Sequence, residues 1–153
     1  LQKVDINSSS EKVIESMQSE TLLKNITIVR NMDQKIPLIL DLGVELIISN
    51  LLKNAIDAID KDGEIKITTK VNDGCVVIQV SDSGCGFAPE LAQKIFEPFY
   101  TTKDIGKGCG LGLTIVDEIV KNYKGKICAQ SVIQQGSTFT ILIPSEQQHD
   151  SRS

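Results

Sequence analysis

The sequence lacks several features that mark specialised classes of protein. It has no tryptophan, 4% aromatic residues and a single histidine, His149. Its four cysteines show neither CxxC spacing nor a neighbouring histidine, which excludes the usual signature of a zinc site or redox dithiol, so we expect free thiols. No apolar run approaches the roughly 18 residues that span a bilayer, and no charged-then-apolar leader opens the chain. These absences predict a cytoplasmic domain without direct membrane contact.

Clustered positive charge is also missing. The net charge is −4 and no basic patch stands out, which argues against nucleic acid as a partner because phosphate binding needs clustered Lys and Arg. The 153 residues, 41% of them hydrophobic and 24% charged, fit one ordinary globular domain. We expect that domain over residues 1–144 and a disordered polar tail over 145–153. The chain starts with Leu1 instead of Met, so we expect further sequence upstream.

Hydrophobic periodicity predicts about three helices. Ser8 and Glu11 have the spacing of a capping box, which favours a helix running toward Glu20. The clearest helix covers residues 44–60, with Gly63 beyond it as a stop signal, and a third covers 111–123. A shorter helix is expected near 90–95, followed by a long loop of the kind that is usually functional or disordered.

Alternating apolar and polar residues predict the strands. They cover residues 1–6 and 25–30 and two hairpins, 64–71 with 76–81 and 125–132 with 137–143. A short apolar run with Pro37 inside it predicts a short or edge strand at 36–40. Helices beside one mostly antiparallel mixed sheet make an α+β fold, a two-layer α/β sandwich.

Three short patterns carry chemistry. Asn50, Asn54 and Asp57 lie at i, i+4 and i+7 of the predicted helix and share one flank, although such a flank is often only solvated. Asp82 opens the run DSGCG after a strand, where glycines allow close approach of a ligand, although a tight turn has the same composition. The run GKGCGLGL at residues 106–113 leads into a helix whose N-terminus favours phosphate, or is a glycine-rich linker with a cap.

Taken in order, five motifs form a more specific pattern. They are ELIISNLLKNAID (45–57), DSGCG (82–86), FEPFYTTK (96–103), GKGCGLGL (106–113) and GSTF (136–139). This series resembles the GHKL (Bergerat) ATP-binding fold, and within it the catalytic domain of bacterial sensor histidine kinases of two-component systems. The resemblance implies binding of ATP and Mg²⁺.

The resemblance also implies roles for single residues. Asn54 corresponds to the Mg²⁺ ligand, Asp82 accepts the adenine amino group, Gly84 and Gly86 make room for the base, and Thr138 reaches the same end of the site. The phosphate end and the lid expected over residues 100–108 take the remaining positions, which are Phe99, Lys103, Lys107, Gly108, Gly110, Leu111 and Gly112. Lys103 is grouped with Asn50 and Asn54 at the catalytic centre.

Two departures from the family pattern refine the function. Asn50 stands where ATP-hydrolysing relatives have a Glu general base, and an amide cannot act as that base. Asp57 stands where many histidine kinases have Lys, so a supporting role beside the metal or phosphates is expected. The only histidine, His149, lies in the polar tail without the flanking pattern of a phosphoacceptor.

The predicted function is therefore that of a phosphoryl-donor domain, which acts on an acceptor domain outside this chain. The chain would transfer the γ-phosphoryl group of ATP to a histidine on a separate dimerisation and phosphoacceptor domain, which then serves a response regulator. Two alternatives stay open. One is a stand-alone serine kinase of the anti-sigma type, and the other is a non-catalytic domain whose interactions are gated by ATP.

Overall fold

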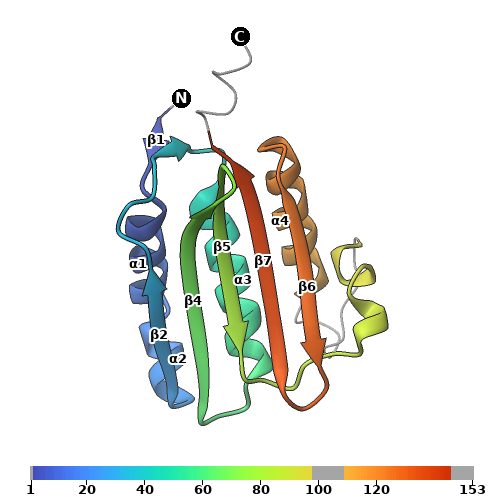
Figure 1. Cartoon of the computed structure of the whole chain (residues 1–153). Helices are drawn as coiled ribbons and strands as arrows, with labels where there is room; N and C mark the ends of the chain where they lie inside the picture. Colours follow the sequence, from blue (N-terminus) through green and yellow to red (C-terminus); the bar gives the residue numbers. More distant parts are fainter. Residues whose placement is uncertain (1, 98–108, 146–153) are drawn as a thin grey trace.

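The computed structural model describes residues 2–97 and 109–145. Helices cover one face of a five-stranded sheet and leave the other face open, so the fold is the predicted two-layer α+β sandwich (Figure 1). The elements in chain order are β1 (Lys3–Val4), α1 (Ile6–Ser16), α2 (Gln18–Leu23), β2 (Ile26–Met32), β3 (Ile39–Leu40), α3 (Val44–Ala58), β4 (Gly63–Asn72), β5 (Cys75–Asp82), two 3₁₀ turns (Pro89–Leu91 and Lys94–Phe96), α4 (Cys109–Asn122), β6 (Lys126–Val132) and β7 (Gly136–Pro144).

The sheet has the strand order β2-β4-β5-β7-β6. Among the strand pairs of the described residues, only β2–β4 is parallel, and α3 lies in the connection between these two strands. Both predicted hairpins are present. In the β4–β5 hairpin, Asp73 (φ +50°) and Gly74 (φ +75°) form the two-residue turn with positive φ angles that favours tight antiparallel pairing. β1 and β3 form a separate two-stranded ribbon at the end of the molecule where the termini lie.

Strand alternation builds the core between the layers. Along β7, Ser137, Phe139, Ile141 and Ile143 are buried, whereas the residues between them are partly exposed. The buried face packs against α3, whose apolar stripe of Ile47, Ile48, Leu51, Leu52, Ala55 and Ile56 is almost fully covered. The period of 3.6 on the helix and the period of two on the strands therefore meet at one interface.

Several boundaries differ from the sequence prediction. The first helix is capped by Asp5, whose Oδ1 accepts a hydrogen bond from Asn7 N at 3.0 Å, so the Ser8–Glu11 capping box was wrong. Ser8 instead donates its hydroxyl to Asp5 Oδ2. Gly63 does not stop a helix; it is the first residue of β4, because α3 already ends at Ala58. The helix expected near 90–95 is two 3₁₀ turns.

Tyr123 ties the end of α4 to the segment before α3. Its hydroxyl donates to Leu40 O and accepts from Leu42 N at 2.8 Å. Burial, the largest cause, raises the pKa of Tyr123 above its ordinary 10.0; the nearby charge of Asp41 acts in the same direction, and the hydrogen bond from Leu42 acts against both.

At the C-terminal end, Ser145 is buried and its N–H donates to Gly74 O at 3.0 Å, although the sequence analysis placed this residue in the tail. In the described ranges, no helix combines the length and apolarity needed to cross a membrane.

Candidate functional site

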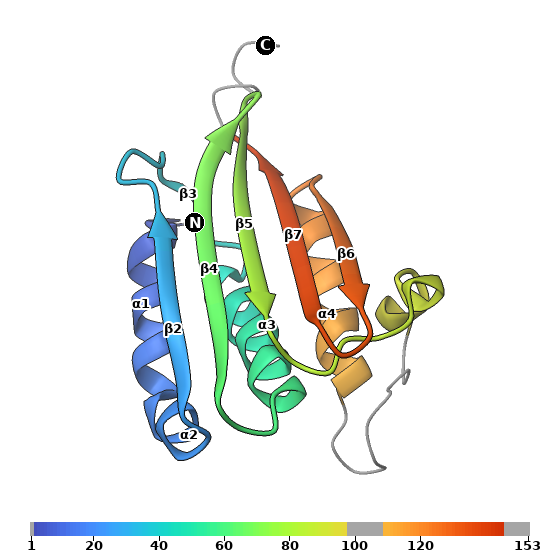
Figure 2. The ribbon, with the colours of Figure 1, turned by 60° about the horizontal axis from the view of Figure 1, so that its bottom comes forward.

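One end of the sandwich gathers the motif residues that the structure describes. β5 ends there at Asp82, α3 ends there at Ala58, and α4 begins there (Figure 2). α3 and α4 pack beside each other beneath the sheet. Gly110, Leu111 and Gly112 belong to the first turn of α4. The N-terminal amides of that helix, with their positive partial charge, therefore lie at the same end as Asp82.

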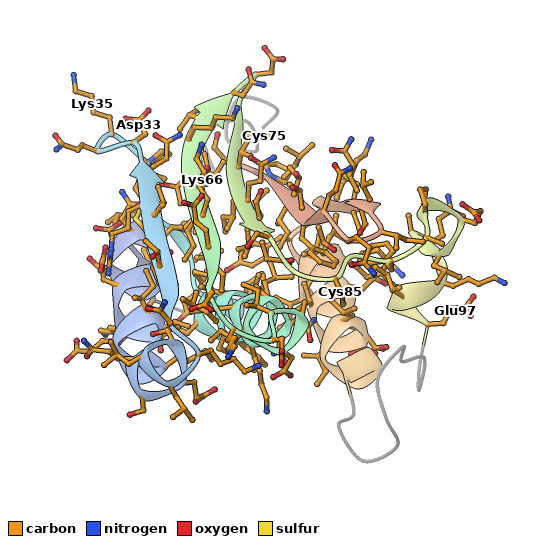
Figure 3. The ribbon with its side chains drawn as sticks, turned by 90° about the horizontal axis from the view of Figure 1, so that it is seen from below. Asp33, Lys35, Lys66, Cys75, Cys85 and Glu97 are labelled. Atoms are coloured by element: carbon orange, nitrogen blue, oxygen red, sulfur yellow. The ribbon has the colours of Figure 1, made fainter. Side chains whose placement is uncertain are left out.

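Asp82 fixes the loop that follows β5. Its Oδ1 accepts a hydrogen bond from Gly84 N at 2.8 Å, which bends the backbone immediately after the strand. The carboxylate is half-buried, and a carboxylate has about four acceptor positions. Figure 3 views the molecule from this end and shows Cys85 in the loop beyond Asp82.

Gly84 lets this loop lie directly on the end of α3. A Cβ atom at Gly84 would be 2.5 Å from Ala58 O and 2.7 Å from Ala58 C, closer than any normal contact. Because the loop lies this close to the helix end, the N–H of the next residue, Cys85, donates a hydrogen bond to Ala58 O at 3.0 Å. The adenine loop proposed from the sequence is thus joined by its backbone to the helix that carries Asn54 and Asp57.

Gly86, at the other side of the loop, also has to be glycine because another part of the backbone lies close to it. Its φ is +67°, and a Cβ atom would be 2.3 Å from Val132 O. Cys85 O also accepts from Gln134 N at 2.7 Å. Both glycines of DSGCG are therefore required by backbone contacts within the protein, a cause that the sequence analysis did not foresee.

The predicted flank of α3 is present, and its three residues differ in environment. Asn50 is half-buried and donates its amide Nδ2 to Leu46 O at 2.7 Å, so its side chain lies along its own helix. Asn54 is also half-buried, with its Nδ2 atom enclosed by protein. Asp57, one turn nearer the helix end, is exposed.

Strand register separates Thr138 from Asp82. Thr138 pairs with Ser81, and their hydroxyls lie 2.9 Å apart. Ser81 in turn pairs with Lys66, which Figure 3 shows on the sheet face away from the helices. Directly opposed residues share a face, so Thr138 lies on the open face, whereas Asp82 is on the helix-covered face.

Ser137 is the residue that the sequence analysis missed. It pairs directly with Asp82, is 7% exposed, and its Oγ lies 2.9 Å from Ser131 Oγ. Ser131 Oγ also accepts from Phe87 N at 2.7 Å. The alternation of a strand could have indicated this residue from the sequence. Along GSTF it places Ser137 and Phe139 on one face of the strand and Thr138 on the other.

Aromatic contacts anchor the segment after the loop. Phe139 on β7 packs against Phe87 and Phe96, with ring centroids 6.3 and 6.4 Å apart. Thr114 of α4 donates its hydroxyl to Phe96 O at 3.2 Å. The segment from Phe87 to Phe96 is therefore held on both the sheet and the helix.

The other predicted positions lie outside the described residues. They are Phe99, Lys103, Lys107, Gly108, the lid expected over 100–108, and His149.

The described residues at this end include a side-chain amide, that of Asn54, of the kind that can give an oxygen to a cation. Within residues 2–97 and 109–145, no group of three or more His, Cys, Asp or Glu side chains is placed to hold a metal ion. Mg²⁺ in phosphate sites keeps several waters and takes one or two protein oxygens, and the Asn54 amide can supply one.

Comparison with known proteins gives a consistent result. Residues 40–147 match the family model described as histidine kinase-, DNA gyrase B-, and HSP90-like ATPase. The signal transduction histidine-protein kinase AtoS of Escherichia coli is 32% identical over 94% of this chain and 24% of its own length. The sensor kinase CckA of Brucella abortus is 39% identical over 71% of this chain and 13% of its own length. The chain thus spans about a quarter or less of these two relatives.

Solved structures share the fold. The structure of full-length ShkA in complex with AMPPNP superposes with a TM-score of 0.84 at 30% identity, covering 95% of this chain and 31% of that one. The nucleotide-free catalytic domain of histidine kinase ThkA gives a TM-score of 0.82 at 28% identity and covers 94% of this chain and 95% of that one. A structure of histidine kinase ThkA in complex with the response regulator protein TrrA gives a TM-score of 0.79 at 28% identity. The match covers 94% of this chain and 41% of that one.

Proposed function

Because the chain belongs to the family of histidine kinase-, DNA gyrase B- and HSP90-like ATPases, we propose that residues 1–144 bind Mg-ATP and donate the γ-phosphoryl group to a histidine on a separate domain. The acceptor would be a dimerisation and phosphoacceptor domain, and a response regulator would then receive the group. The likeness to ShkA solved with AMPPNP and to ThkA solved with a response regulator supports this assignment. Such a domain would work in the cytoplasm.

The observation that carries the proposal is the joining of three elements at one end of the sandwich. The loop after Asp82 bonds to the end of α3 through Cys85 N and Ala58 O, and α4 begins at the same end. The proposed acceptor for the adenine amino group, the proposed amide ligand and the N-terminal amides of α4 therefore lie on neighbouring elements that contact one another. Such preorganisation is what nucleotide binding and in-line transfer require.

Each described residue has a proposed role. The carboxylate of Asp82 accepts the adenine amino group while Oδ1 keeps its bond to Gly84. Ser137, opposite Asp82 on the same sheet face, takes the position near the base that the sequence analysis gave to Thr138. Asn54 contributes an amide oxygen to Mg²⁺, which would neutralise charge on the phosphates when bound. Asp57 supports this arrangement from the exposed flank.

The phosphate end rests on α4. The first-turn amides of Gly110, Leu111 and Gly112 are proposed to bind phosphate oxygens. We keep Phe99, Lys103, Lys107 and Gly108 as proposals from the family resemblance.

The environment of Asn50 favours transfer to a protein over hydrolysis. Activation of water needs a group that removes its proton, and a neutral amide cannot do this. The Asn50 amide is in addition held by Leu46 O at 2.7 Å. The isolated chain should therefore bind ATP and hydrolyse it very slowly.

The test has a binding arm and a transfer arm. Titration calorimetry of the chain should show Mg-dependent ATP binding, and Asn54→Ala should remove the Mg dependence while part of the ADP affinity stays. With a helical hairpin that carries the acceptor histidine, the chain should produce an acid-labile, alkali-stable phosphohistidine. His149→Ala is the control and should leave this signal intact.

Two results would contradict the proposal. Unchanged Mg-ATP affinity in Asn54→Ala would refute the metal assignment. Label transferred from ATP to the isolated chain, and lost in His149→Ala, would refute the donor role.

A further inference from the structure

Lys24 reaches the end of α3 from a distant part of the chain. It is the residue after α2, and its ammonium Nζ donates to Ile56 O and to Ile59 O, both at 2.9 Å. These carbonyls belong to the last turn and the C-cap of α3, where the regular hydrogen bonds of the helix end; Ile56 O also accepts from Ile59 N at 3.2 Å. A cation at the C-terminus of a helix also interacts favourably with the helix dipole.

The backbone of Lys24 is fixed as well. Its carbonyl accepts from Asp62 N at 2.7 Å, and the neighbouring Asn25 donates its amide to Asp62 Oδ1 at 2.7 Å. Lys24 therefore joins the α2–β2 junction to the α3–β4 junction by both its main chain and its side chain. The long side chain has a defined anchor, in contrast to an ordinary solvated lysine.

The same turn of α3 carries the adenine loop. Between the two carbonyls bound by Lys24 lies Ala58, whose carbonyl accepts from Cys85 N and whose backbone is in contact with Gly84. The last turn is thus held on one side by an ammonium and on the other by the loop that follows Asp82. Movement of this turn would displace the loop, because the Gly84 contact has no free space.

We propose that Lys24 is a positioning residue for the adenine end of the nucleotide site. It acts by holding the last turn of α3, so that Ala58 presents its carbonyl to Cys85 and keeps Asp82 and Gly84 in the geometry that binds the base. This role rests on the proposed function. The phosphate end is built on α4, so Lys24 should affect the base contacts and leave the phosphate contacts unchanged.

The test compares Lys24→Met, Lys24→Arg and the control Lys70→Met in the full chain. Lys70 is an exposed lysine on β4, near the opposite end of the strand from Gly63. Adenosine and an ATP analogue should both bind Lys24→Met about three- to tenfold more weakly, because part of the stabilisation that Lys24 gives the helix end through its two hydrogen bonds is passed on to the loop. The ratio of the two affinities should stay at the parental value. Lys24→Arg should recover most of the binding, and Lys70→Met should match the parent.

Amide hydrogen exchange supplies a second readout. Exchange of the Cys85 amide should become faster in Lys24→Met, whereas amides in the centre of β5 should keep the parental rate. A purely structural role predicts a lower Tm with parental affinity and a parental Cys85 rate, and that result would overturn the proposal. Weaker binding without a change at Cys85 would also overturn it. If the parent chain bound neither adenosine nor the ATP analogue, the proposed function itself would be refuted. That result differs from failure of the Lys24 proposal, in which the parent chain binds both compounds.

Discussion

The contact between Gly84 and Ala58 makes a sharp prediction for Gly84→Ala. The new Cβ would lie 2.5 Å from Ala58 O, whereas ordinary contacts begin near 3.4 Å, so the loop or the helix end has to move by about 1 Å. The obstacle is backbone and cannot be cleared by a change of rotamer. The movement strains the Cys85 N to Ala58 O hydrogen bond of 3.0 Å.

The magnitude follows from the cost of overpacking. Extra atoms in a well-packed site typically cost about 1 to 3 kcal/mol, which is less than the roughly 5 to 15 kcal/mol that stabilises a folded domain. Gly84→Ala should therefore fold, with Tm lowered by about 2 to 4 °C for each kcal/mol lost. Because the shift occurs beside the proposed base contact, ATP affinity should fall at least about tenfold, equivalent to about 1.4 kcal/mol.

Denaturant unfolding and titration calorimetry measure the two effects. Cys85→Ala is the matched control, since Cys85 is exposed and its bonds in this loop use backbone atoms. A second variant, Gly84→Ala with Ala58→Gly, removes the Ala58 Cβ at 2.8 Å but leaves the carbonyl at 2.5 Å. It should not restore affinity. Parental stability and affinity in Gly84→Ala, or full recovery in the double variant, would refute the reasoning.

Three further predictions concern the Ser137–Thr138 pair, Asp82 and Tyr123. Ser137→Ala should weaken ATP binding, whereas Thr138→Ala on the open face should leave calorimetric affinity unchanged; the reverse result would restore Thr138 to the site. Asp82→Asn keeps an oxygen for Gly84 N but places an amide donor toward the adenine amino group, so it should lose the preference for ATP over GTP with little loss of Tm; retained discrimination in competition binding would contradict this. Tyr123 has a folded pKa above its unfolded value near 10.0, so its contribution to the unfolding free energy is complete below pH 10.0 and is lost as the pH rises toward the folded pKa. Tyr123→Phe should lower stability at pH 7, by about 1 kcal/mol per lost hydrogen bond, and should flatten this alkaline decline in denaturant titrations; an unchanged decline would assign it to another group.

Local patterns predicted much of the fold because they act over a few residues. The apolar stripe of α3 and the Asp73–Gly74 turn are read directly from sequence, and both are present. The strand order could not be read in this way, because the pairing of β2 with β4 and of β5 with β7 joins residues far apart in the chain. The cap at Asp5 was missed because several polar residues near the start of α1 have cap chemistry, and tertiary contacts select among them.

In the candidate site, too, local patterns could be predicted from the sequence, whereas contacts between distant residues could not. The flank of Asn50, Asn54 and Asp57 follows from helical period, and its environment follows only from packing. The glycine pattern indicated close approach of a ligand, and not that the backbone of Ala58 would be the neighbour of Gly84. Lys24 carried no sequence signal at all, since a lysine between a helix and a strand is usually solvated.

The place of β7 in the sheet has a consequence for synthesis of the protein. β7 is the last strand of the described chain, yet it lies between β5 and β6 and pairs with both. While the ribosome is still making residues 136–144, the nascent chain exposes the strand edges of β5 and β6 that pair with β7, and the part of α3 that packs against β7. Folding of the domain as a unit must therefore wait until its final strand has left the exit tunnel, and a premature stop before Gly136 should yield an aggregation-prone product instead of a shortened domain.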